Sequence, residues 1–180
     1  MDAIAYATAV HQRFDPFGAG ISDQVLALYP ASTFSAPTYA LIGVDTDFNM
    51  TCEIRNIARA AVRPSRKPVF RYFFTHTLEN DVSLQTLRAF HGQELFFVFD
   101  NFSGLSSTYT MTSAEMALAN TMMGYWTRFA ATGDPNGGGA VAWPQYDPQT
   151  DSMLEIDDAQ TPINGYNNTQ CDYLSTLPQI

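Results

Sequence analysis

Basic residues are scarce in this chain, which has 9 Lys and Arg against 18 Asp and Glu and a formal net charge of −9. Phosphate backbones and anionic lipid headgroups repel a surface of that sign, so neither nucleic acid nor an anionic membrane surface is an expected partner. The basic residues that do occur gather at helical spacing in one short stretch. That spacing predicts a solvated helix face made of Arg55, Arg59, Arg63, Arg66 and Lys67.

Long apolar runs are also absent. No stretch approaches the roughly 20 apolar residues that a bilayer-spanning helix needs, so no membrane span is expected. The opening Met1-Asp2-Ala3-Ile4 has neither a basic region nor an uninterrupted apolar region, and it predicts no signal peptide in this chain. Aromatic and amide residues are nevertheless abundant and lysine is rare, a composition that is found in exported proteins. N-x-[ST] triplets begin at Asn49, Asn101 and Asn167.

Cysteine occurs only twice, at Cys52 and Cys171. Two cysteines this far apart are either buried free thiols or one bridge that closes a very long loop, and counting alone leaves both open. No histidine or second cysteine stands at ligand spacing to either of them, so no metal site is expected there. No cofactor is expected either.

What the chain does have is enough apolar residues, 46% of 180, to bury a sizeable core in one domain or one large part of a domain. Helices are predicted over 1–13, 25–28, 37–48 and 51–62, and the last of these has Ile54, Ile57, Ala58 and Ala61 as its apolar face. Phe14 to Gly18 breaks the first helix, and Ser22 and Asp23 cap the second, which stops at Tyr29-Pro30.

Strands are predicted where β-branched and aromatic residues cluster, over 69–74, 94–99 and 153–156. Thr112 and Glu115 form a capping box at the start of a long helix that Gly133 ends. One broad face of that helix is expected to hold Met116, Ala119, Met122, Met123, Trp126, Phe129 and Ala130. The tail up to Cys171 reads as loop. The mixture of predicted helices and strands indicates an α/β layered protein. The strands are too few for a doubly wound sheet, so the chain is either a small α+β domain or a domain with part of its sheet missing.

His91 is the candidate for chemistry. It stands beside Gly92 in a loop before an apolar run, where an imidazole can act as a general base at neutral pH. By itself this pattern also fits an ordinary polar loop histidine. The His91 and Glu94 pair has H-x-x-E spacing, but the strand expected after it disfavours a helical metal site.

Several blocks, in order, resemble the type B carboxylesterases, the cholinesterase-like branch of the α/β-hydrolases. They are Val25 to Pro30, Thr46 to Arg55, Val69 to His76, His91-Gly92-Gln93-Glu94, Tyr125 to Asn136, Trp143 to Tyr146, and Cys171-Asp172-Tyr173. Two blocks depart from the family pattern. Glu53 stands where the family usually has a proline after the first cysteine, and Cys171-Asp172-Tyr173-Leu174 stands where the family has C-x-F-W.

The resemblance implies an α/β fold that is the C-terminal part of an α/β-hydrolase, with residues 1–66 mainly helical and 67–180 holding the last strands and the long helix. It implies acyl transfer from small-molecule carboxylic esters by a Ser–Glu–His triad, with His91 as the general base. It also implies that Cys52 bridges Cys171 and that the protein is secreted or extracellular.

The triad serine and acid are expected upstream of this chain, because no G-x-S-x-G occurs in it. The nearest approach is Gly104 to Thr108, where Ser106 comes after the histidine and reads as a surface-loop serine. Asp2 and Asp15 have no motif to recommend them as the acid. Phe97, Phe99 and Phe102 would line an acyl pocket or, by preference, pack in the core.

Three hypotheses remain open. The chain is the histidine-bearing part of an ester hydrolase, a non-catalytic cholinesterase-like binding or adhesion module of the neuroligin type, or an inactive truncated gene product. An incomplete sheet would expose an unpaired edge, which predicts self-association.

Overall fold

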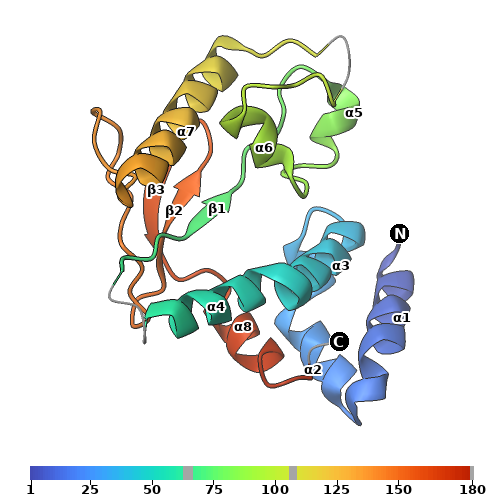
Figure 1. The fold of residues 1–180 in the computed structure, drawn as a ribbon. Coiled ribbons are helices and arrows are strands. Elements are labelled where there is room, and N and C mark those ends of the chain that lie inside the picture. Colours follow the sequence, from blue (N-terminus) through green and yellow to red (C-terminus); the bar gives the residue numbers. More distant parts are fainter. Residues whose placement is uncertain (63–66, 106–108, 179–180) are drawn as a thin grey trace. The chain divides into compact units, whose positions relative to one another are not determined.

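The computed structural model describes residues 1–62, 67–105 and 109–178. They form two compact units, one of Met1–Ala60 with Tyr166–Ile180 and the other of Ala61–Gly165 (Figure 1). We call them the helical unit and the sheet unit. Among the described residues, no helix combines the length and the apolar character needed to cross a membrane.

The helical unit contains the helices α1 (Ala3–Phe14), α2 (Ile21–Leu28), α3 (Pro37–Thr46), α4 (Cys52–Val62) and α8 (Asn168–Leu174), with short turns η1 (Asp15–Phe17), η2 (Ala31–Thr33) and η3 (Asp47–Thr51). α1, α3 and α4 lie near their predicted positions, but α8 lies in the tail that was expected to be loop. The predicted capping of α2 is also wrong, because Gly20 is its N-cap and Ser22 and Asp23 lie inside the helix. The Asp2 side chain caps α1 by accepting from the Ala5 amide at 2.8 Å. Pro37 opens α3, where its missing N–H costs nothing. The break after Phe14 is confirmed as η1.

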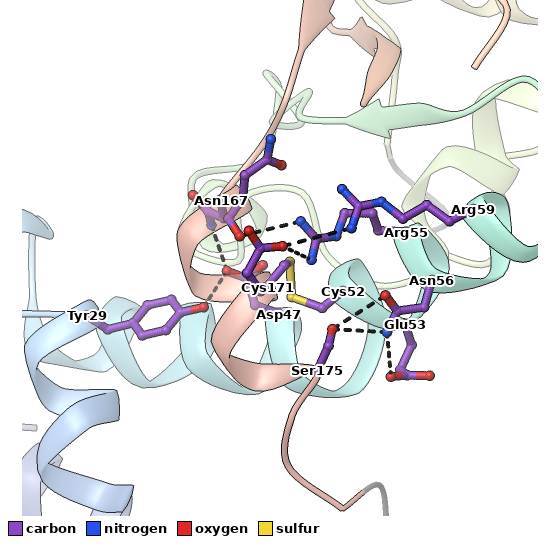
Figure 2. Close-up of a disulfide and its surroundings, with 12 residues drawn as sticks. Tyr29, Asp47, Cys52, Glu53, Arg55, Asn56, Arg59, Asn167, Cys171 and Ser175 are labelled. Carbon is purple, nitrogen blue, oxygen red and sulfur yellow. Dashed lines mark hydrogen bonds and ion pairs between the residues drawn. A yellow bond between two sulfur atoms is a disulfide. The ribbon is translucent and has the colours of Figure 1, made fainter. Parts of the chain in front are cut away.

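The core of this unit is aromatic and aliphatic, with Val10, Phe14, Val25 and Val44 fully buried. A disulfide joins Cys52 at the start of α4 to Cys171 in α8, with Cα atoms 5.0 Å apart (Figure 2). The bridge implied by the family resemblance is therefore present. It connects residues 119 apart in sequence, so the whole sheet unit lies within the loop that it closes.

The predicted inner face of α4 is right for Ala58, which is 6% exposed, but wrong for its two isoleucines. Ile54 is 46% exposed and Ile57 is 64% exposed, whereas Arg55 is 1% exposed. Cys52 faces α8 because of the disulfide, and this places Arg55 and Ala58, which follow at helical spacing, on the same inward side.

Arg55 is therefore not part of a solvated basic face. Its Nη2 lies 2.8 Å from an Asp172 carboxylate oxygen, and its Nη1 donates to the Asn168 carbonyl at 3.4 Å. Both partners belong to α8, more than a hundred residues further along the chain, where helical periodicity could not reveal them. Arg63 and Arg66 lie outside the described residues.

The sheet unit contains β1 (Tyr72–Phe74), β2 (Ser152–Ile156) and β3 (Gln160–Asn164), in the order β1-β2-β3. β1 runs parallel to β2 with Tyr72 opposite Leu154, and β2 and β3 form an antiparallel hairpin. The small, incomplete sheet agrees with the expected part of an α/β-hydrolase. β3 lies in the tail that was expected to be loop. It is short, polar and carries Pro162, as suits an edge strand.

The helices of this unit are α5 (Val82–Gln85), α6 (Gln93–Val98) and α7 (Ser113–Thr132). α6 replaces the strand predicted over 94–99, which is a wrong prediction. Gln93 and Phe97 are both fully buried and lie one helical turn apart, while Leu95 and Phe99 are exposed. A short apolar run cannot by itself distinguish a strand from a buried helical turn.

α7 begins and ends as predicted. Thr112 and Glu115 form the capping box, and Gly133 ends the helix with a φ of 79°. Its buried face is Glu115, Leu118, Ala119, Met122 and Tyr125. Met116 and Phe129, predicted to be inside, are 47% and 46% exposed. Ala119 and Met122 of the predicted face are buried, and Glu115, Leu118 and Tyr125 complete the buried face in place of Met116 and Phe129.

Candidate active-site histidine and its surroundings

His91 is exposed at the tip of a turn that leads into α6. Gly92, the next residue, adopts φ 81°, a left-handed conformation that a side chain would strain, and it forms the N-cap of the helix. Among the residues that the structure describes, the imidazole has no hydrogen-bond partner. The ring is therefore open to a group supplied from outside these residues.

The base of this turn is held from inside by Gln93. Its side chain is fully buried, with Oε1 accepting from the Phe90 amide at 3.2 Å and Nε2 donating to the His76 carbonyl at 3.0 Å. The Gln93 amide also donates to the Phe90 carbonyl at 3.0 Å.

Glu94 is in the first turn of α6, three residues after His91. The Tyr72 hydroxyl lies 3.4 Å from its Oε1, and burial together with this carboxylate raises the pKa of Tyr72 to about 12. Tyr72 is therefore a neutral donor to Glu94 at physiological pH. His91 precedes the helix, so His91 and Glu94 do not form a helical metal-ligand pair.

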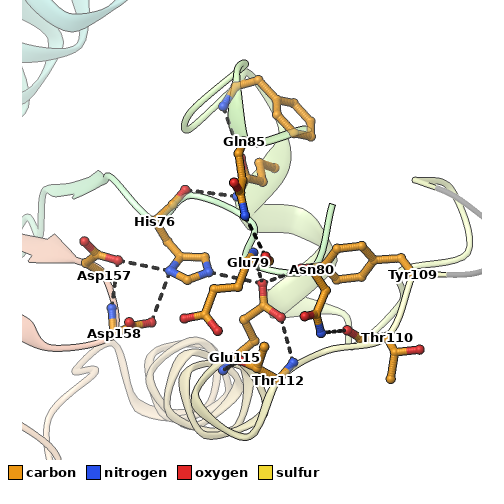
Figure 3. Close-up of polar contacts among 12 residues, drawn as sticks. His76, Glu79, Asn80, Gln85, Tyr109, Thr110, Thr112, Glu115, Asp157 and Asp158 are labelled. Atoms are coloured by element: carbon orange, nitrogen blue, oxygen red, sulfur yellow. Dashed lines mark hydrogen bonds and ion pairs between the residues drawn. The ribbon is translucent and has the colours of Figure 1, made fainter. Parts of the chain in front are cut away.

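A second histidine, not singled out by the sequence, lies in the interior of the unit. His76 follows β1 and is 2% exposed. Its Nδ1 lies 3.0 Å from Asp157 and 3.2 Å from Asp158, and its Nε2 lies 3.3 Å from Glu115 (Figure 3). Both ring nitrogens of His76 therefore face carboxylate oxygens. The available signal was that His76 is the last residue of the block Val69 to His76, two residues after the predicted strand.

Glu115 is the centre of this network. Its carboxylate accepts from the Thr112 amide at 2.8 Å, from the Glu79 amide at 3.1 Å and from the Tyr109 hydroxyl. Burial alone raises the pKa of Glu115, but the hydrogen bonds from Tyr109, the two backbone amides and His76 outweigh it, and the pKa lies below its ordinary value. The ionised carboxylate thus ties the start of α7 to the segment after β1.

Asp158 has the opposite tendency. Partial burial and the negative charges of Glu79, Asp157 and Glu115 raise its pKa, against the attraction of His76. His76, Asp157 and Asp158 each offer one ligand atom within 4.8 Å of the others, and among the described residues they are the group with metal-ligand spacing. The contacts of both aspartates with His76 Nδ1 already account for their approach, and both aspartates are about half exposed.

The other residues considered from the sequence lie elsewhere. Asp2 caps α1, and Asp15 accepts from Ser22 at 2.6 Å and lies 3.0 Å from His11, so both have local roles in the helical unit. Ser106 lies outside the described residues.

The aromatic candidates divide between core and surface. Phe97 is buried against His76 and Phe102, which confirms the preferred core packing for these two rings. Phe99 is 73% exposed. A small hollow of about 140 Å³ lies between β1 and α7, but His91 does not line it; its walls are Phe70, Tyr72, Tyr125, Trp126, Phe129, Pro135 and Trp143.

The family model described as "Carboxylesterase family" matches residues 5–174, and the chain belongs to that family. Among curated proteins, it is similar to the human (Homo sapiens) "Cocaine esterase", with 40% identity over 51% of this chain and 16% of that protein.

Two further relatives widen the comparison. A "Fatty acyl-CoA hydrolase precursor, medium chain" from Anas platyrhynchos is 38% identical over 53% of this chain and 17% of its own length. The Gallus gallus "Acetylcholinesterase" is 34% identical over 61% of this chain and 14% of its own length. The matched region therefore spans about a sixth of the length of these relatives.

Proposed function

We infer that this chain is the histidine-bearing C-terminal part of a carboxylic-ester hydrolase, completed by polypeptide that supplies the serine, the acid and the oxyanion-binding amides. The observation that carries this proposal is the exposed imidazole of His91, without a partner among the described residues, on a turn whose base is buried and hydrogen-bonded. A general base must be accessible to the proton that it removes, and its backbone must be held in place.

In the proposed reaction, His91 removes the proton from the serine hydroxyl as that oxygen attacks the ester carbonyl. The imidazolium then returns the proton to the leaving alkoxide, which departs as an alcohol. His91 next takes a proton from water as the water oxygen attacks the acyl-enzyme carbonyl. The imidazolium then gives this proton to the serine oxygen as its bond to the acyl carbon breaks, which releases the carboxylic acid and the free serine. The substrate is a small-molecule ester, and the disulfide agrees with secretion into an oxidising compartment.

The sheet edge is part of the same proposal. β1 is the end strand of the sheet within the described residues, so its outer edge is where a strand of the completing polypeptide would pair. Without that polypeptide, we expect copies of the chain to associate through this edge.

The test is to co-express the chain with the upstream segment of its own gene and to measure hydrolysis of a short-chain p-nitrophenyl ester. We expect turnover only when both parts are present, and its loss in His91→Ala. His11→Ala removes another exposed histidine, from the helical unit, and should leave the rate unchanged.

Background turnover in the assembled protein would contradict the proposal. If a defined protein partner were then captured by that assembly, the adhesion-module hypothesis would take its place.

A further inference from the structure

We propose that Gln93 is a positioning residue for His91: its buried carboxamide holds the turn that presents the imidazole. The catalytic role of Gln93 rests on the proposed function, but its structural role in the turn can be tested without any ester substrate.

The turn is closed at its base by two hydrogen bonds between the same two residues. The Gln93 amide donates to the Phe90 carbonyl at 3.0 Å, and the Phe90 amide donates to Gln93 Oε1 at 3.2 Å. Only His91 and Gly92 lie between them. The backbone of His91 is thus restrained on both sides, although its side chain is exposed.

The same carboxamide connects the turn to the interior. Gln93 Nε2 donates to the His76 carbonyl at 3.0 Å, and the His76 ring is itself held by Asp157 and Glu115 (Figure 3). The turn that carries His91 is therefore connected through His76 to the start of α7 and to the turn between β2 and β3. Phe97, one helical turn after Gln93, packs against the His76 ring with centroids 5.3 Å apart.

The site requires a glutamine for chemical reasons. It needs an acceptor toward the Phe90 amide and a donor toward the His76 carbonyl, at the end of a side chain of this length. Glutamate offers the acceptor but no donor, methionine offers neither strong group, and asparagine is one methylene shorter. Because Gln93 is fully buried, water does not replace a lost bond without rearrangement.

The experiment compares backbone amide exchange and backbone order parameters by NMR in the full 180-residue chain and in Gln93→Met, Gln93→Glu and Phe97→Leu. The reference amide is that of Leu154, which donates to the Arg71 carbonyl at 3.0 Å in the same unit. In Gln93→Met we expect exchange at Phe90 to quicken at least tenfold relative to Leu154. Order parameters at His91 and Gly92 should fall from about 0.85 to below 0.6.

Gln93→Glu keeps the acceptor for Phe90 and should retain part of the protection that Gln93→Met loses. Phe97→Leu is the matched control, because it removes buried volume from the same helix face and leaves the carboxamide intact. It should quicken exchange at Phe90 and Leu154 by the same factor, without selective loss of order at His91.

Three results would overturn the inference. They are an unchanged ratio of Phe90 to Leu154 exchange in Gln93→Met, the same selective effect in Phe97→Leu, or a wild-type chain in which the Phe90 amide is unprotected.

In the assembled hydrolase, Gln93→Met should lower kcat with little change in KM, and Gln93→Glu should recover part of the lost kcat. If His91→Ala left the rate of ester hydrolysis unchanged, the hydrolase proposal would be rejected, whereas the amide-exchange results would still support the role of Gln93 in the turn.

Discussion

At the scale of single residues, the ion pair between Arg55 and Asp172 is asymmetric. The guanidinium is 1% exposed and the carboxylate is 66% exposed, with 2.8 Å between Nη2 and Oδ1. The arginine stem fills space between α4 and α8, so its removal costs packing as well as charge.

We therefore expect Arg55→Ala to lower the free energy of unfolding by about 2–4 kcal/mol, measured by urea denaturation. Arg59→Ala is the control from the same helix. Its guanidinium is 34% exposed and lies 3.9 Å from Asp172, so the loss should stay below about 1 kcal/mol. Equal losses in the two variants would show that burial of Arg55 contributes nothing.

The Glu115 carboxylate predicts a dependence of stability on pH. Because its pKa is lowered in the folded chain from the ordinary 4.5, the ionised form stabilises the fold. That contribution is complete above pH 4.5 and is lost as the pH falls toward the lowered pKa.

In Glu115→Gln, we expect lower stability at pH 7 and a shallower decline of stability between about pH 5 and pH 3. Tyr109→Phe removes the hydrogen bond that lowers this pKa most, and it should flatten the decline in part. Denaturation series across this pH range measure both. A decline as steep in Glu115→Gln as in the wild type would contradict the assigned role.

At the scale of elements, α7 depends on its first turn. The Thr112 hydroxyl accepts from the Glu115 amide at 3.1 Å, and the Glu115 carboxylate accepts from the Thr112 amide at 2.8 Å. We expect Thr112→Ala to cost about 1 kcal/mol of stability in urea denaturation. Ser113→Ala, at the exposed neighbouring position, should change it by less than about 0.5 kcal/mol. A similar cost at both positions would mean that the cap is not what stabilises the helix.

The elements also show which features the sequence could predict. Local chemistry predicted both ends of α7, because a capping box and a terminal glycine act within one turn. It failed for α6, whose six residues are too few for their period to be read. It failed for the inner face of α4, because the partner of Arg55 lies in α8.

The candidate site, too, could be predicted from the sequence only in part. His91 could be chosen from its local sequence and from the family resemblance. The residues around it could not, because Gln93 and His76 are joined by contacts between a helix start and the segment after a strand, 17 positions apart. The His76 contacts with Glu115 and Asp157 span 39 and 81 positions. Pairings at such distances leave no periodic pattern in the sequence.

At the scale of the whole molecule, the disulfide is the covalent link between distant parts of the chain. Cys52 and Cys171 are 119 positions apart, and closing so long a loop stabilises the folded state by about 5 kcal/mol in the loop-entropy model. We expect the double variant Cys52→Ala/Cys171→Ala to lose a large part of this stability. Added reductant should lower the urea midpoint of the wild type and leave that of the double variant unchanged. A wild-type midpoint that did not respond to full reduction would contradict this.

The central claim is that His91 removes the serine proton in a hydrolase to which this chain contributes its C-terminal part. The most direct measurement is the pre-steady-state release of p-nitrophenolate from a p-nitrophenyl ester by the assembled protein, compared between wild type and His91→Gln. We predict a burst in the wild type and an acylation rate lower by about 10²–10⁴-fold in the variant. Bursts of the same rate in both proteins would contradict the claim.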